Sequence, residues 1–283
     1  MATLMDGAAL AARIRRELKE EIAEFGPVGL ATVLVGDDPA SDIYIRRKHK
    51  AADEVGISAT DYRLASSTPE EELVELVEEL DDDDTIDGIL VQTPLPDQID
   101  EARIMRTIDP MKDVDGLGPF SAGQLSLGHQ TLVPATPLGV MYLLDEYGVT
   151  VEGSRAVVVG RSVLVGKPVA LLLLQANATV TICHSRTVDL ARHTLEADIL
   201  VAAVGHPGLL TADMVKAGAT VIDVGITRTD AGLLGDVDAG VADVAALLTP
   251  VPGGVGPMTI AALLGNALRA ARYRSGALAF PRI

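Results

Sequence analysis

Apolar runs rich in β-branched residues recur along the chain, and each run ends at a glycine or a polar turn. Helical patterns, with apolar residues three or four positions apart, lie between most of these runs. Strands that are apolar on both faces and alternate with helices are typical of parallel sheets. The pattern therefore predicts an α/β fold, with strands at Leu30–Val35, Ile86–Val91, Ala156–Val159, Val180–Cys183, Ile199–Val204 and Thr220–Val224.

The spacing of these elements indicates two domains. Residues Asp109–Pro134 are rich in Gly, Pro and Asp and have little periodicity, which favours ordered loops near a domain boundary. A helix is expected over Pro137–Tyr147, and strands and helices alternate closely after it. We predict one α/β domain over residues 1–137, completed by a C-terminal helix in 257–283. The second, over 138–256, is predicted to be a Rossmann-like domain with a doubly wound parallel sheet.

Composition and charge exclude several classes of partner. The formal net charge of −17 disfavours binding to nucleic acid or to anionic membranes, and no run approaches the roughly 20 apolar residues of a membrane span. The single cysteine, Cys183, fits a reducing compartment, so we expect a cytoplasmic protein. The excess of acids, with 17 Arg against 6 Lys, resembles a surface adapted to high salt, although an ordinary acidic surface has the same composition.

The segment Arg155–Pro168, with Gly160 and Gly166, has the form of a strand, a glycine turn and a helix start. Glycines let the backbone approach a pyrophosphate, and a helix N-terminus offers free N–H groups. The spacing departs from GxGxxG because Ser162 stands where the second glycine would be. A dinucleotide site and a purely structural turn are both compatible with this segment.

The next strand favours NADP over NAD. No Asp or Glu follows Val180–Cys183, where an NAD site usually has an acid for the ribose hydroxyl. Ser185, Arg186 and Arg161 offer instead a hydroxyl and two cations, which suit a 2′-phosphate. Arg186 could equally be a solvated surface residue. Two later strand ends, at Gly205 and Ile226, are candidates to line the same site.

Tyr44 and Lys48 lie four residues apart on an expected helix and therefore share a face. A lysine at a pocket wall can have a lowered pKa and act as an acid or a base. The neighbouring Arg46, Arg47 and Lys50 support the alternative of a solvated basic face.

Three further segments carry candidate chemistry. Gln92 follows an apolar strand, just before a proline-rich turn, and Asp115 lies in the string Lys112–Gly116. That string lacks the spacing of a calcium loop, so no metal is expected. The turn at Pro252, Gly253 and Gly254 has few side chains, so a flat ligand could approach its backbone.

Together these strings resemble the methylenetetrahydrofolate dehydrogenase/cyclohydrolase family, often called FolD. The resemblance covers nearly the whole chain and depends on the order and spacing of many short strings. They are Gly36–Ser41 with Tyr44 and Lys48, Val91–Pro96, Lys112–Gly116, Thr136–Gly139, Val159–Ser162 with Val165–Pro168, and Pro250–Thr259.

The resemblance implies a folate-binding catalytic domain, an NADP-binding domain and a homodimer. It implies oxidation of 5,10-methylenetetrahydrofolate and then hydrolysis to 10-formyltetrahydrofolate. Lys48 is the implied catalytic centre, with Gln92 holding its amine, Tyr44 positioning the folate and Asp115 binding the pterin. The family pattern places Val91 and the turn at Pro252, Gly253 and Gly254 at the substrate. The family pattern places Arg161 and Ser185 at the NADP phosphate. With the candidates from the glycine turn and the strand ends, the predicted cofactor site comprises Gly160, Arg161, Ser162, Gly166, Ser185, Arg186, Gly205 and Ile226.

Other functions remain open at this stage. A shikimate-type NADP dehydrogenase also has two domains and a lysine, and a non-catalytic folate binder would tolerate the loss of Lys48. A family member with weak cyclohydrolase activity is disfavoured because Tyr44, Lys48 and Gln92 are all present.

Overall fold

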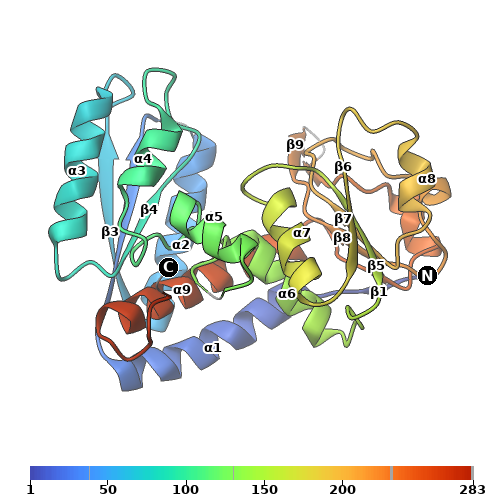
Figure 1. The fold of residues 1–283 in the computed structure, drawn as a ribbon, viewed down its shortest axis with the longest axis horizontal. Helices are drawn as coiled ribbons and strands as arrows, with labels where there is room; N and C mark the ends of the chain where they lie inside the picture. The colour runs from blue at the N-terminus through green and yellow to red at the C-terminus, as the bar shows by residue number, and fades with distance from the viewer. Residues whose placement is uncertain (38, 130, 230–231, 282–283) are drawn as a thin grey trace. The chain divides into compact units, whose positions relative to one another are not determined.

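The computed structural model describes residues 1–37, 39–129, 131–229 and 232–281, which form two compact units (Figure 1). The six-stranded unit comprises Met1–Ala12 and Ala135–Thr259, and the three-stranded unit comprises Arg13–Pro134 and Ile260–Ile283. Each has a parallel sheet covered by helices, so the predicted α/β fold class is confirmed. Asp38, within the Gly36–Ser41 string, lies outside the described residues.

The three-stranded sheet has β2 (Val28–Val35) at its centre, between β3 (Ile57–Leu64) and β4 (Gly88–Val91). Both neighbours run parallel to β2, and every residue of β2 is buried. A strand with partners on both edges and helices on both faces has no side that meets water, which explains its continuous apolar sequence.

Helices cover the two faces of this sheet. Ala31 and Val33 pack in one core with Val77, from α3 (Glu70–Asp82), and Ile104, from α4 (Glu101–Thr107). On the opposite face, Thr32 Oγ1 lies 2.7 Å from His49 Nε2 of α2 (Pro39–Val55). The side-chain alternation of β2 thus anchors α2 against the sheet, and α2 carries Tyr44 and Lys48.

Further helices contribute to this unit: α5 (Pro119–Ser126), most of α1 (Gly7–Phe25) and the later part of α9 (Val255–Arg274). Near the end of α9, Arg274 Nη1 donates to Ile86 O and Asp87 Oδ1, both at 2.7 Å. The residues of α1 and α9 are divided between the two units.

The six-stranded sheet is parallel throughout. The chain passes from β5 outward to β6 and then returns to the other side of β5 to form β7. This reversal creates a topological switch point between β5 and β7, where open α/β sheets bind ligands. The strand order is β1 (Thr3–Leu4), β11 (Leu247–Leu248), β8 (Thr220–Asp223), β7 (Ile199–Ala202), β5 (Arg155–Val159) and β6 (Thr179–Cys183).

Helices and short elements surround this sheet. Its core includes Val157, Leu200 and Val221, one from each of three neighbouring strands. The surrounding elements are α6 (Ala135–Glu146), α7 (Gly166–Gln175), α8 (Leu190–Thr194), η1 (Ala212–Met214), η2 (Ala239–Asp243) and the hairpin of β9 (Thr227–Thr229) and β10 (Gly232–Leu234).

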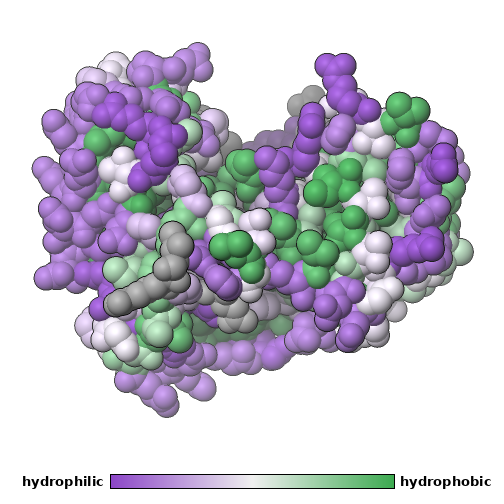
Figure 2. All heavy atoms as spheres, viewed as in Figure 1, coloured by the Kyte–Doolittle hydropathy of each residue, from purple (hydrophilic) through white to green (hydrophobic). Residues whose placement is uncertain are grey.

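The predicted strands are confirmed, with bounds within two residues of those observed, and so are the predicted helices over residues 137–147 and 257–272. Thr3 and Leu4 form β1, which pairs with β11 and so belongs to the six-stranded sheet. The predicted domain boundaries place these two residues in the first domain instead. Among the described residues, no helix combines the length and apolar character needed to cross a bilayer. Hydrophilic residues cover much of the face drawn in Figure 2, with apolar patches between them.

Candidate active site

The three-stranded unit brings Lys48 and Gln92 into contact. Lys48 Nζ donates to Gln92 Oε1 at 3.1 Å, although the two residues are 44 positions apart. Gln92 is itself fixed, because its backbone N–H donates to Val33 O and its Nε2 donates to Thr93 O, both at 2.8 Å. The amide oxygen at the carboxyl end of β4 is therefore aimed at the lysine by the sheet.

Opposing effects act on the charge of Lys48. Burial lowers the pKa of Lys48, while the nearby Asp115 carboxylate raises it by a smaller amount. For Asp115, burial raises the pKa and the charge of Lys48 opposes that rise. Since Gln92 adds no charge, Asp115 is the group that holds a proton on this lysine. The environment thus favours a lysine that can exchange a proton more readily than an exposed one.

The acids and the lysine of the string Lys112–Gly116 differ in their partners. Lys112 Nζ donates to three carbonyl oxygens at the end of α3, those of Leu80 (2.8 Å), Asp81 (2.6 Å) and Asp83 (2.9 Å). These carbonyls lack partners within the helix, so Lys112 caps it. Lys112 is accordingly a structural residue.

Asp113 also has a structural role. Its buried carboxylate accepts hydrogen bonds from Gly118 N at 2.8 Å and Leu117 N at 3.2 Å, and burial raises its pKa to about 6. Asp115, two residues later, lies beside Lys48 instead. Asp113 therefore stabilises the turn, whereas Asp115 is available for chemistry.

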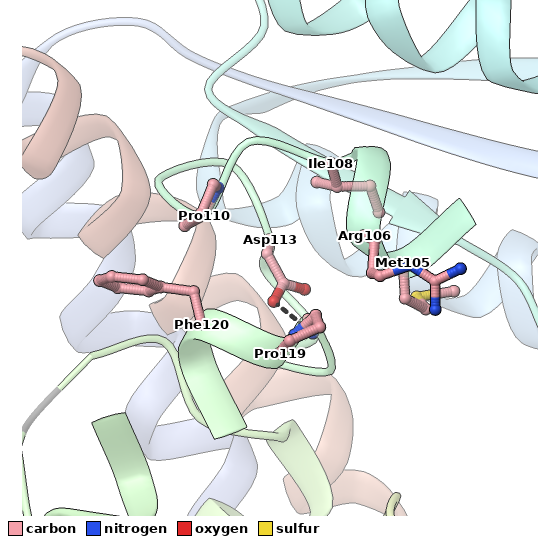
Figure 3. Close-up of a pocket in the computed structure, with 8 residues that line it drawn as sticks. Met105, Arg106, Ile108, Pro110, Asp113, Pro119 and Phe120 are labelled. Carbon is pink, nitrogen blue, oxygen red and sulfur yellow. Dashed lines mark hydrogen bonds between the residues drawn. The ribbon is translucent and has the colours of Figure 1, made fainter. Parts of the chain in front are cut away.

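A cavity of about 260 Å³ lies next to Asp113 (Figure 3). The Asp113 carboxylate points toward the backbone at the start of α5, where its bond to Gly118 N is drawn. Lys48, Gln92 and Asp115 do not line this cavity, so it is separate from the candidate site. Its lining residues are Met105, Arg106, Ile108, Pro110, Asp113, Gly118, Pro119 and Phe120.

Tyr44 and Val91 flank the candidate site in different ways. The Tyr44 side chain is 44% exposed on the helix that carries Lys48, so its ring is available to a ligand. Val91 is only 2% exposed, and its side chain belongs to the core against α3 and α4. A substrate could therefore reach Val91 only through its backbone.

In the six-stranded unit, Gly160 and Gly166 allow a close approach of backbone segments. Gly160 follows β5 with φ +131°, and a Cβ there would lie 2.2 Å from Ala203 O. A Cβ on Gly166, the first residue of α7, would lie 2.3 Å from Gly160 O. Ser162 Oγ accepts from Val165 N (3.1 Å) and Gly166 N (3.4 Å), so it caps the start of α7.

Three candidate phosphate ligands lie at neighbouring strand ends. Val159 and Cys183 are register partners in β5 and β6, and Arg161 and Ser185 each follow two residues later. Arg161, Ser185 and Arg186 are exposed, and Arg161 and Arg186 form no ion pair with any residue that the structure describes. The site thus offers two solvated cations and a hydroxyl, without an acid from the end of β6.

A buried carboxylate that the sequence analysis missed orders the loop after β7. Asp236 accepts from three successive N–H groups, those of Val204 (2.7 Å), Gly205 (3.1 Å) and His206 (2.7 Å). A Cβ on Gly225 would lie 2.1 Å from Asp236 Cγ, so glycine is required there. The spacing of glycines and aspartates in residues 223–236 was the only sequence signal for this arrangement.

Asp223 plays the corresponding role one strand away. Its carboxylate accepts from Gly225 N (3.0 Å), Asp236 N (2.9 Å) and Val237 N (3.0 Å), and burial raises its pKa to about 6. Ile226, just after this loop, is 40% exposed. The two carboxylates therefore shape the loops that carry Gly205 and Ile226.

The turn at Pro252, Gly253 and Gly254 also belongs to the six-stranded unit, whereas Lys48, Gln92 and Asp115 belong to the three-stranded unit. Gly253 O accepts from Ala8 N at 2.9 Å, and a Cβ on Gly7 would lie 1.9 Å from Gly254 O. The turn is therefore packed tightly against the start of α1.

Comparison with known proteins identifies both parts of the chain. Residues 5–115 match the family model "Tetrahydrofolate dehydrogenase/cyclohydrolase, catalytic domain", and residues 134–275 match the NAD(P)-binding domain of the same family. The bifunctional protein FolD of Halothermothrix orenii is 53% identical over 281 residues, which cover 96% of this chain and 99% of the relative.

Solved structures of the family have the same fold. The bifunctional enzyme FolD from Campylobacter jejuni has 47% sequence identity and a TM-score of 0.95, covering 97% of this chain and 100% of its own. FolD from Trypanosoma brucei, solved with NADP cofactor and an inhibitor, has 40% identity and a TM-score of 0.93, covering 98% of this chain and 99% of its own.

The shikimate-type alternative is only a distant relative. Shikimate dehydrogenase from Aquifex aeolicus has 16% identity and a TM-score of 0.54, covering 88% of this chain and 93% of its own, which indicates a shared fold alone. Two family models that together span most of the sequence, with relatives above half identity, decide the matter. The chain belongs to the tetrahydrofolate dehydrogenase/cyclohydrolase family.

Proposed function

We propose that this protein oxidises 5,10-methylenetetrahydrofolate to 5,10-methenyltetrahydrofolate with NADP and then hydrolyses the product to 10-formyltetrahydrofolate. Family membership supports both reactions. The observation that carries the hydrolytic step is the hydrogen bond between Lys48 Nζ and Gln92 Oε1, next to the partly buried Asp115. The three-stranded unit would bind folate, and the six-stranded unit would bind NADP.

Asp115 and Tyr44 would hold the folate. A buried carboxylate can accept hydrogen bonds from pterin N–H groups, which also offsets the cost of its burial. The half-exposed Tyr44 ring would stack on or position the substrate. The Val91 backbone would supply a further contact.

Lys48 would handle the proton in the hydrolytic step. The methenyl substrate is a cation, so a permanently charged lysine beside it would repel it. A lysine whose pKa is lowered by burial spends part of its time neutral and can take a proton from water as the water oxygen adds to the methenyl carbon. Gln92 orients the amine without adding charge.

The six-stranded unit would hold NADP at the carboxyl ends of its strands. Gly160 and Gly166 have no side chains at the two ends of this turn, so a pyrophosphate can approach the backbone there. Arg161, Ser185 and Arg186 would bind the 2′-phosphate, and Gly205 with Ile226 would line the remaining site. When bound, NADP accepts a hydride from the one-carbon unit.

A direct assay tests the proposal. The purified protein is mixed with methylenetetrahydrofolate and either NADP or NAD, and the absorbance of the methenyl product is followed as it forms and decays. We expect formation with NADP and enzyme-dependent decay to the formyl product. A protein that binds folate but produces no methenyl product would be a non-catalytic binder, and equal efficiency with NAD would contradict the NADP assignment.

We also propose that two copies associate and that the enzyme works in the cytoplasm. The dimer is supported only by the family resemblance, and the compartment by the single buried free thiol of Cys183. Light scattering of the full chain would distinguish a dimer from a monomer, and fractionation of the source cells would locate the protein.

A further inference from the structure

The side-chain amide of Asn266 links the last helix to the segment that carries Asp115. Asn266 lies on α9 and is 3% exposed. Its Nδ2 donates to Val114 O and to Val133 O, both at 2.8 Å. Because an amide nitrogen has two hydrogens, both are used, and each holds a backbone carbonyl from a different segment.

These two backbone segments also pack directly against each other. Gly116 has φ +62°, and a Cβ there would lie 2.7 Å from Leu132 O and 2.8 Å from the Val133 carbonyl carbon. The Asp115–Gly116 turn therefore lies against the backbone of residues 132–133. Asn266 ties the two together where they meet.

Other contacts fix the turn on both sides of Asp115, and Gly116 N, in the peptide that follows Asp115, donates to Asp113 O at 2.9 Å. Lys112 and Asp113 bond to α3 and to the start of α5, respectively. The carbonyl of Val114, which belongs to the peptide group leading into Asp115, accepts from Asn266. The Asn266 amide thus holds the peptide that leads into Asp115, and it helps to set the direction in which the Asp115 side chain leaves the backbone.

We propose that Asn266 is a positioning residue that holds Asp115 where its carboxylate can accept hydrogen bonds from the pterin of the substrate. This inference rests on the proposed folate-binding role of Asp115. Without the amide, two buried carbonyls lose their donor and the turn shifts to recover partners. Hydrogen bonds weaken steeply with distance and angle, so even a small shift of Asp115 would weaken folate binding.

The test compares Asn266→Ala, Asn266→Ser and Asn266→Asp in the full chain. We expect Asn266→Ala to raise the KM for methylenetetrahydrofolate about tenfold, the effect of losing hydrogen bonds to buried acceptors. Asn266→Ser keeps one donor and should give an intermediate KM. Asn266→Asp has the same shape but places a carboxylate oxygen against two carbonyls, so its KM should rise at least as far as that of the alanine variant.

Two further readouts separate positioning from a general loss of structure. The kcat of the dehydrogenase step should fall less than the KM rises, and the Kd for NADP should remain within about twofold, because both hydrogen bonds of the Asn266 amide stay within the three-stranded unit. Val77→Ala, which removes buried methyl groups from α3, serves as the control for lost stability.

Equal KM increases in Asn266→Ala and Val77→Ala would overturn the inference, and so would a wild-type KM in Asn266→Ala. Should the alanine variant fail to fold, the same comparison with Asn266→Ser decides. A wild-type protein without either activity would refute the proposed function instead, and direct titration with tetrahydrofolate would then still test whether Asn266 supports folate binding.

Discussion

The two units differ in the role of their carboxylates that have little exposure to solvent. In the six-stranded unit, Asp223 and Asp236 are each bonded to three backbone N–H groups and serve to shape loops. In the three-stranded unit, the partly buried Asp115 lies beside Lys48, and each of the two groups shifts the pKa of the other. A raised carboxylate pKa alone therefore does not indicate a reactive group, because Asp113 and Asp223 both have raised pKa values and structural roles.

The same contrast extends to the ligands that each unit offers. The three-stranded unit has side chains already in contact with one another, as Lys48 and Gln92 are. The six-stranded unit offers backbone without side chains at Gly160 and Gly166, and it has the exposed cations Arg161 and Arg186 near the strand ends. Side-chain chemistry is therefore expected from the first unit and ligand binding from the second.

The largest expected effect is that of Lys48→Ala. Because the neutral amine is the proposed base, methenyl hydrolysis should fall by at least about 100-fold, while the Kd for NADP stays within about twofold. Stopped-flow absorbance and a binding titration would measure the two quantities. Lys50→Ala, an exposed lysine on the same helix, is the matched control and should leave both unchanged. Full hydrolytic activity in Lys48→Ala would contradict the assignment of side-chain chemistry to the three-stranded unit and ligand binding to the six-stranded unit.

Next in size is the effect of Asp236→Ala. This change leaves three backbone N–H groups without their acceptor, so the free energy of unfolding should fall by about 3 kcal/mol. Urea denaturation would measure the loss, and the Kd for NADP should rise because the loop at Gly205 is no longer held. Asp213→Ala, at an exposed acid of the same unit, should change the unfolding free energy little. A minor effect at Asp236 would mean that its bonds do not order the loop.

A smaller effect is expected from Arg161→Ala combined with Arg186→Ala. Removing two cations from the proposed phosphate site should lower kcat/KM for NADP about tenfold or more, with little change for NAD. Steady-state kinetics with both dinucleotides would show the ratio directly. Arg192→Ala, another exposed arginine of this unit, is the control. Parallel losses with NADP and NAD would argue against a phosphate contact.

The smallest effect concerns pH. Hydrolysis should increase with pH as Lys48 loses its proton, and the Asp115 carboxylate raises the pKa of this lysine. Asp115→Asn removes that negative charge, so the rising part of the kcat profile should move to lower pH. Rates corrected for uncatalysed hydrolysis would establish the profile. A shift to higher pH would mean that another group sets the proton affinity of Lys48.

Much of the fold was accessible from sequence because each strand is a local apolar run with a clear end. The order of strings also predicted Lys48 and Gln92 as neighbours, which their hydrogen bond confirms. Short strands such as β1 and β11 escaped prediction, since two residues carry no periodicity and depend on a partner far along the chain.

It was harder to predict which residues of a single string have structural roles and which have chemical roles. Lys112, Asp113 and Asp115 are close in sequence, yet only the three-dimensional partners show which residues cap a helix or build a turn. Ser162 was assigned to the cofactor, and its hydroxyl also caps α7. Asp236 and Asn266 were missed because their bonds join residues more than 30 and more than 130 positions away.

The pairing of β1 with β11 has a consequence for how the protein is made. Thr3 pairs with Leu247, so the outer edge of the six-stranded sheet cannot close until 244 further residues have been synthesised. Until then β1 is an unpaired segment of the growing chain, and chaperones or other chains can bind it. Deleting it would leave β11 as the sheet edge, and we expect the cost to appear first as aggregation during expression rather than as lost activity.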